Sequence, residues 1–131
     1  MTDLAPDAAA LDRLARRAFD ALPEEVRQAC ASVLVRVEEM PSDAQLDSVG
    51  MENEWELTGL YDGTPLIDRS HLDVEPRQDV VWLFRRPILL EWIERGDVGL
   101  AELVTHVLVH ELAHHLGWSD EDIARIDRWW E

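Results

Sequence analysis

The chain has 131 residues, of which 47% are hydrophobic, and its formal net charge at pH 7 is −16. This length and composition fit one domain built around one core, so we expect a single domain over residues 1–131. All twelve basic residues are arginines. Because so acidic a chain repels nucleic acid and anionic membrane surfaces, we expect neither as a partner, and the charge leaves the oligomeric state open.

Cysteine usage and the first residues bear on the compartment. Cys30 is the only cysteine, which excludes an internal disulfide and a cysteine-based zinc cluster. Residues 1–17 place acidic residues before any base and have no apolar core of signal-peptide length. No apolar run approaches the length that spans a bilayer. We therefore expect a soluble, cytoplasmic protein.

The N-terminal third predicts two helices and a strand. Apolar residues recur at helical spacing over Asp7–Leu22, with Asp7 as a candidate N-cap. Pro23 ends that helix and can begin a second one, which we expect to run to about Ala31. Valines then alternate with other residues over Val33–Glu39, and this period of two predicts a half-buried strand.

The middle of the chain predicts a loop, a hairpin and another strand. Residues Ser42–Glu54 are polar and acidic without a clear period, so we expect a loop with at most one helical turn. Asp62-Gly63 is a turn signal between Leu57–Tyr61 and Leu66–Ile67, which is typical of a β-hairpin. A strand is expected over Asp79–Phe84.

The C-terminal third predicts three helices. Pro87 can open a helix over Ile88–Arg95, which Gly96 then ends. Asp97 is a candidate cap for a long helix over Val98–Leu116, and a last helix is expected over Asp120–Trp130. The order of elements predicts an α+β fold, in which a small and mostly antiparallel sheet packs against helices and the long helix lies near the C-terminus.

The long helix carries the strongest chemical signal, the sequence HExxH at His110–His114. Residues four apart lie on one face of a helix, so His110 and His114 present two imidazoles to the same point. Zinc binds such nitrogens at about 2.0–2.1 Å, and catalytic zinc sites commonly take three protein ligands and leave one position open. Glu111 lies beside that point and can take a proton from a bound water. The alternative is an ordinary amphipathic helix, but buried imidazoles need partners and a metal supplies one.

The residues after the second histidine extend the motif to HExxHxxGxxD. Gly117 can end the helix in the left-handed conformation, after which the chain turns back and Asp120 can approach the metal as third ligand. Asp120 can instead be a first-turn acid of a following helix capped by Ser119. Other acids can then take the ligand position: Glu121, Asp122 and Asp127.

Three further residues are candidates for the surroundings of the metal. His106 lies one turn before His110 and shares its face, so it can support the ligands or line a cleft. His115 is rotated off that face, and we expect a surface or supporting histidine there. Tyr61 can donate to a developing oxyanion, although packing of its ring in the turn is the favoured interpretation.

Five segments of the chain resemble the small bacterial zincin-like metallopeptidase family: Ala21–Glu25, Val35–Pro41, Gly59–Leu66, Val81–Leu89 and His110–Ile123. The last segment is the most specific. The resemblance implies a minimal zincin-like fold with one zinc ion in a HExxHxxGxxD site. Metzincins share the HExxHxxGxx pattern but have a methionine turn after it. The methionines of this chain all precede the motif: Met1, Met40 and Met51.

These observations predict a zinc-dependent peptidase in which Glu111 activates water against a peptide or protein substrate. An extended substrate can add a strand to a sheet edge, for which Val80–Phe84 is the candidate. Manganese, iron or cobalt also suit a ligand set of two histidines and an aspartate. The alternative function is a non-catalytic or weakly active metal-binding domain with a structural or regulatory partner.

Overall fold

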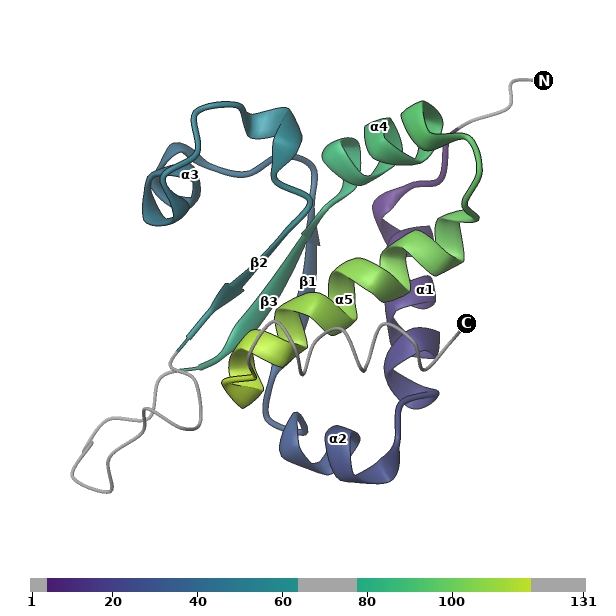
Figure 1. Ribbon diagram of the computed structural model, residues 1–131, viewed down its shortest axis with the longest axis vertical. Coiled ribbons are helices and arrows are strands. Elements are labelled where there is room, and N and C mark those ends of the chain that lie inside the picture. Colours follow the sequence, from purple (N-terminus) through teal and green to yellow (C-terminus); the bar gives the residue numbers. More distant parts are fainter. Residues whose placement is uncertain (1–4, 64–77, 119–131) are drawn as a thin grey trace.

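The computed structural model describes residues 5–63 and 78–118, and it has the α+β architecture that the sequence predicts (Figure 1). Within those residues, no helix is long and apolar enough to cross a membrane. The predicted second hairpin strand, at Leu66 and Ile67, and the predicted last helix, Asp120–Trp130, lie outside the described residues. The elements in chain order are α1 (Ala8–Asp20), α2 (Glu24–Ala29), β1 (Leu34–Glu38), α3 (Asp43–Val49), the 3₁₀ turn η1 (Glu54–Glu56), β2 (Gly59–Asp62), β3 (Val80–Phe84), α4 (Arg85–Arg95) and α5 (Leu100–Leu116).

The N-terminal elements form as predicted. The Asp7 carboxylate accepts a hydrogen bond of 2.8 Å from the Ala10 N–H and so caps α1. Helix α2 starts after Pro23 and ends at Ala29, two residues before the expected end. Strand β1 has the predicted half-buried pattern, because its residues alternate between exposed and half-buried positions.

The sheet has the order β1-β3-β2, with β3 parallel to β1 and antiparallel to β2. The described sheet is thus mixed rather than mostly antiparallel, because one of its two described pairings is parallel. The expectation that Val80–Phe84 forms an edge is wrong, since β3 is the central strand. Its side chains are buried on both faces of the sheet, at Val81 and Leu83 on one and at Phe84 on the other. Strand β2 is the edge of the described sheet on the side of α5.

Helices α1 and α5 pack on each other and on one face of the sheet, α1 against β1 and α5 mainly against β2 (Figure 1). The main core lies between them and includes Val81 and Leu83 of β3. A smaller cluster of buried residues lies on the opposite face of β3, where α3 and the residue that follows the turn η1 contribute to it. Its members are Leu46, Leu57, Leu60 and Phe84.

Helix α3 replaces most of the loop expected over Ser42–Glu54. The Ser42 hydroxyl accepts from the Gln45 N–H at 3.1 Å, and the Gln45 side chain accepts from the Ser42 N–H at 2.8 Å. This reciprocal pair is a capping box, which stabilises the start of a helix in a polar segment. Leu46 is buried and anchors the short helix to the smaller cluster.

The starts of α4 and α5 differ from the prediction, whereas their ends agree with it. Helix α4 begins at Arg85, so Pro87 lies within its first turn, where its missing N–H costs no helical hydrogen bond. It ends at Arg95, and the C-cap residue Gly96 has a φ of 68°. The expected capping role of Asp97 is wrong, because Gly99 is the N-cap of α5 and no side chain caps that helix.

Candidate metal centre

Helix α5 holds the motif residues against a buried scaffold. The buried residues of α5 occur on several sides of the helix: Leu103, Val104, Val107, Leu108, Val109, Leu112, Ala113 and His115. Gly117 ends the helix with a φ of 73°, as predicted, and the Trp118 N–H donates to the Ala113 carbonyl at 3.0 Å. The motif is therefore fixed to a helix whose packing and C-terminal cap restrict its movement.

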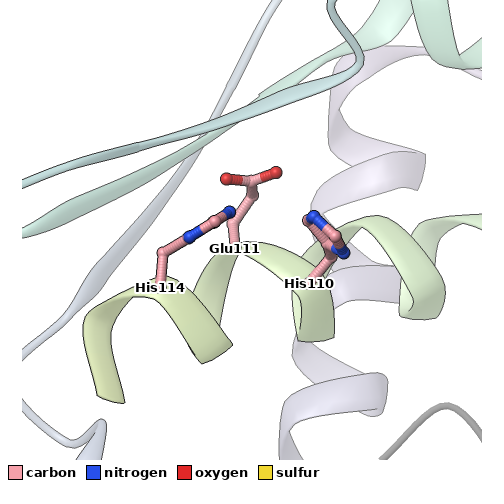
Figure 2. Close-up of side chains that lie close together, drawn as sticks. All are labelled: His110, Glu111 and His114. Atoms are coloured by element: carbon pink, nitrogen blue, oxygen red, sulfur yellow. The ribbon is translucent and has the colours of Figure 1, made fainter. Parts of the chain in front are cut away.

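Side chains of His110, Glu111 and His114 converge on one side of α5, the side that faces the sheet edge in Figure 2. One potential ligand atom from each lies within 4.8 Å of the others, and the two imidazole centroids are 5.2 Å apart. A metal ion with bonds of about 2 Å can bridge such groups after small side-chain rotations. Two imidazole nitrogens with a carboxylate oxygen are donors that suit zinc. This group of residues therefore fits a metal ion.

Exposure differs among the three residues. His110 and Glu111 are half-buried, whereas His114 is exposed to solvent. Structural zinc sites are commonly closed by four protein ligands, and catalytic sites keep an open position. The described residues supply two histidines and one carboxylate to the candidate centre, and solvent reaches it at His114.

The fold changes the protonation of Glu111. Burial raises the pKa of its carboxyl group from 4.5 to about 7, and a hydrogen bond from the backbone N–H of Tyr61 partly opposes that rise. A carboxyl group with a pKa near neutrality can both accept and release a proton at physiological pH. In the metal-free protein this carboxyl group therefore lies beside the two candidate metal-binding histidines with its pKa raised by burial.

His106 shares the face of His110, as the helical spacing predicts. The two rings are stacked, with centroids 6.4 Å apart and an angle of 24° between their planes, and His106 is half-buried. The supporting role of His106 stays a prediction, and its ring contact with His110, a candidate metal ligand, favours that role.

His115 is buried, so the expectation of a surface position is wrong, and its supporting role stays a prediction. Its Nδ1 lies 3.0 Å from the Tyr61 hydroxyl and 3.5 Å from Asp79 Oδ2, and its Nε2 lies 3.2 Å from the Ala29 carbonyl oxygen. Residue i+1 is rotated by about 100° on a helix, which carries His115 from the metal face into the core. Tyr61 lies in β2 rather than in a turn, and its oxyanion role stays a prediction.

A cavity of about 390 Å³ lies beside Glu111 and His114. This volume falls within the range of about 300–1,000 Å³ that is common for ligand pockets. The lining combines apolar side chains with the two motif residues: Val49, Leu57, Gly59, Leu60, Tyr61, Gly63, Glu111 and His114. The candidate centre therefore opens onto a space that can receive part of a substrate.

The predicted third ligand, Asp120, lies outside the described residues, as do its alternatives Glu121, Asp122 and Asp127. Two residues that contact this site carried no clear signal in the sequence. Asp79 is 2% exposed beside His115, and Gly59 packs against the side chain of Glu111. An acid before an apolar strand and a glycine in a strand are too common to identify a site.

Comparisons with known proteins agree with the geometry of the centre. A search of curated proteins found no match to this chain. The sequence profile of the zincin-like metallopeptidase family matches residues 30–130, which span the sheet, the motif helix and the candidate ligands. The match covers more than half of the chain, and with the His110, Glu111 and His114 group it shows that this protein belongs to the zincin-like metallopeptidase family.

Proposed function

We propose that this protein is a zinc-dependent metallopeptidase that hydrolyses peptide bonds with Glu111 as general base. The observation that carries the proposal is the convergence of His110, Glu111 and His114 beside a cavity. The rise in the pKa of Glu111 to about 7 adds to it. His110 and His114 would hold the ion, with Asp120 as the proposed third ligand. When bound, zinc polarises a carbonyl group and lowers the pKa of a water molecule towards 7.

Glu111 performs the proton transfers in this mechanism. Its carboxylate takes a proton from the attacking water and then donates that proton to the leaving amine. The Tyr61 N–H restricts the orientation of this carboxylate. Because an amine leaves poorly without protonation, removal of the carboxylate should stop turnover while zinc stays bound.

The substrate is proposed to lie along β2, the sheet edge beside the motif helix. The Thr58 carbonyl accepts from the Phe84 N–H at 2.9 Å, so the backbone groups of residues 58, 60 and 62 face β3. The backbone groups of Gly59 and the Tyr61 carbonyl face outward, towards the space in which a peptide can add a strand, whereas the Tyr61 N–H on the same side donates to Glu111. This arrangement places the outer edge of β2 next to the candidate base.

The cavity favours an apolar substrate side chain near the scissile bond. Apart from Glu111 and His114, its described lining has no charged or titratable side chain other than the Tyr61 phenol, and its apolar walls come from Val49, Leu57 and Leu60. A positional peptide library should therefore show a preference for apolar residues at one position next to the cleaved bond. Val49, 43% exposed, offers a substitution with little effect on the core, and Val49→Asp should reduce that preference.

The proposal is tested with purified protein loaded with zinc. Metal content is measured by mass spectrometry, and peptide-library cleavage is compared between wild type and Glu111→Gln. Glu102→Gln, an exposed change in the first turn of the same helix, is the matched control. One zinc per chain, with cleavage by wild type and by the control but not by Glu111→Gln, is the expected result.

Two other outcomes would contradict parts of the proposal, the first the peptidase function and the second the role of Glu111. One zinc per chain without cleavage by wild type would favour the metal-binding domain with a structural or regulatory partner. Cleavage that persists in Glu111→Gln would remove the general base from the mechanism. Loading with manganese, iron(II) or cobalt tests whether another ion supports the reaction better.

A further inference from the structure

Tyr61 joins the edge strand to the motif helix at two points. Its backbone N–H donates to the Glu111 carboxyl group, and its hydroxyl is hydrogen-bonded to Nδ1 of His115 at 3.0 Å. Its ring meets the His115 imidazole edge-on, with centroids 5.6 Å apart. The same residue therefore contacts the candidate base with its backbone and a core histidine with its side chain.

The hydrogen bond between Tyr61 and His115 does not depend on the charge of the imidazole. Nε2 of His115 donates to the Ala29 carbonyl oxygen, which can only accept. In the neutral ring Nδ1 is then an acceptor for the Tyr61 hydroxyl, and in the protonated ring it is a donor to the same oxygen. The contact is therefore available in both states of the ring.

His115 is itself fixed in place. It is 0% exposed, held at Nε2 by the carbonyl of Ala29, the last residue of α2, and flanked at Nδ1 by Asp79, which is 2% exposed. The backbone of Asp79 is tied to the sheet, since its carbonyl accepts from the Leu34 N–H at 2.9 Å. Gly63 packs so closely on this cluster that an added Cβ would overlap Asp79 Oδ1 and lie 2.8 Å from the Tyr61 hydroxyl.

We infer that His115 and Asp79 are positioning residues, which hold Tyr61 and thereby keep its backbone N–H on the Glu111 carboxylate. The two adjacent histidines of α5 thus have different tasks, since His114 faces the metal side and His115 anchors the strand that orients the base. The expected effect of these residues on catalysis rests on the proposed function, whereas their expected effect on the hydrogen bond of the Tyr61 N–H does not.

The test uses three substitutions of this network. Tyr61→Phe removes the hydroxyl. His115→Gln places a polar group near the former Nε2 and leaves none at Nδ1, whereas His115→Asn keeps a polar group near Nδ1. Cys30→Ala is the control for general destabilisation, because Cys30 is fully buried next to Ala29 and its thiol takes no part in the described hydrogen bonds of the network.

The first measurement is amide hydrogen exchange by NMR on the full chain without metal. The protection of the Tyr61 N–H is expressed relative to that of the Leu60 N–H, which faces β3, so that loss of global stability cancels. We expect this ratio to fall about fivefold or more in Tyr61→Phe and His115→Gln, the change that corresponds to one lost hydrogen bond. His115→Asn should restore much of the ratio, and Cys30→Ala should leave it unchanged.

The second measurement is peptide hydrolysis by the zinc-loaded variants. A misdirected base should lower kcat about fivefold or more in Tyr61→Phe and His115→Gln, with little change in KM and unchanged zinc content. An unchanged exchange ratio in both variants, or equal losses in His115→Asn and His115→Gln, would overturn the inference. If wild type cleaves no peptide, the proposed function fails while the exchange ratio still decides whether the network holds Tyr61.

Discussion

Gly59 of the edge strand lies so close to the motif helix that a Cβ added to it would stand 2.6 Å from Val107 Cγ1 and 3.2 Å from Glu111 Cγ. No real side chain tolerates the shorter of these distances, so the backbone of β2 approaches α5 as only glycine allows. This contact sets the separation between the strand proposed to bind substrate and the helix that carries the base.

Gly59→Ala should therefore destabilise the protein by about 2 kcal/mol, because β2 must move away from the helix. Denaturant unfolding checks the value. Gly99→Ala is the matched control, since nothing lies within 4 Å of an added Cβ there, and it should cost less than about 1 kcal/mol. Equal losses of unfolding free energy in the two variants would show that the close approach of β2 to α5 does not contribute to stability.

Glu111 should make the stability of the metal-free protein depend on pH. The pKa of its carboxyl group is raised from 4.5 to about 7 in the folded state, so the folded state binds more protons than the unfolded state between these values. The contribution of this group is present below pH 4.5 and is lost as the pH rises through 7.

Glu111→Gln removes this titration. We expect the metal-free variant to be more stable than wild type at pH 8 by about 2 kcal/mol, allowing for partial solvent exposure, and to gain little at pH 4.5. Chemical denaturation at the two pH values measures the difference. A stability difference that is the same at both values would contradict the raised pKa.

Zinc should stabilise the folded protein through His110 and His114. At a zinc concentration one hundred times the Kd, a ligand that binds only the folded state adds about 2.7 kcal/mol. Thermal unfolding with zinc and with a chelator should show this gain in wild type and its loss in His110→Ala and His114→Ala.

Asp120→Asn tests the third ligand by the same measurement. The Kd of this variant for zinc should rise by more than roughly 10–100-fold, which is the typical loss when a residue that only supports the metal ligands is mutated. Asp97→Asn, an exposed acid before the motif helix, is the control and should leave the Kd unchanged. A larger rise in the Kd for zinc in Glu121→Gln than in Asp120→Asn would indicate that Glu121, not Asp120, is the third ligand.

Cys30 should be unreactive in the native protein. It is fully buried, and burial raises the pKa of its thiol to about 11, so very little thiolate exists at pH 8. A thiol reagent added to folded protein should react slowly, and denaturant should release one reactive thiol per chain. Rapid modification of the native protein would mean that the segment between α2 and β1 opens readily.

The sequence by itself determined the elements with strong local signals. The helix capped by Asp7, the alternating strand β1 and the end of α5 at Gly117 follow from spacing, caps and the left-handed preference of glycine. The convergence of His110, Glu111 and His114 follows from the helical repeat alone. These features depend on residues within one or two turns of each other, and so a linear pattern contains them.

Tertiary structure alone decided the relationships between distant segments. Strand order is one of these relationships. The apolar sequence of β3 is compatible with an edge strand and with a central strand, and only the positions of β1 and β2 show that it is central. The burial of His115 is another, since its partners Tyr61 and Asp79 lie more than thirty positions away in the sequence. The raised pKa of Glu111 arises in the same way, from burial beneath a strand that only the fold brings to the motif helix. Local residues thus specify the metal-binding face, and long-range packing specifies the environment in which its chemistry takes place.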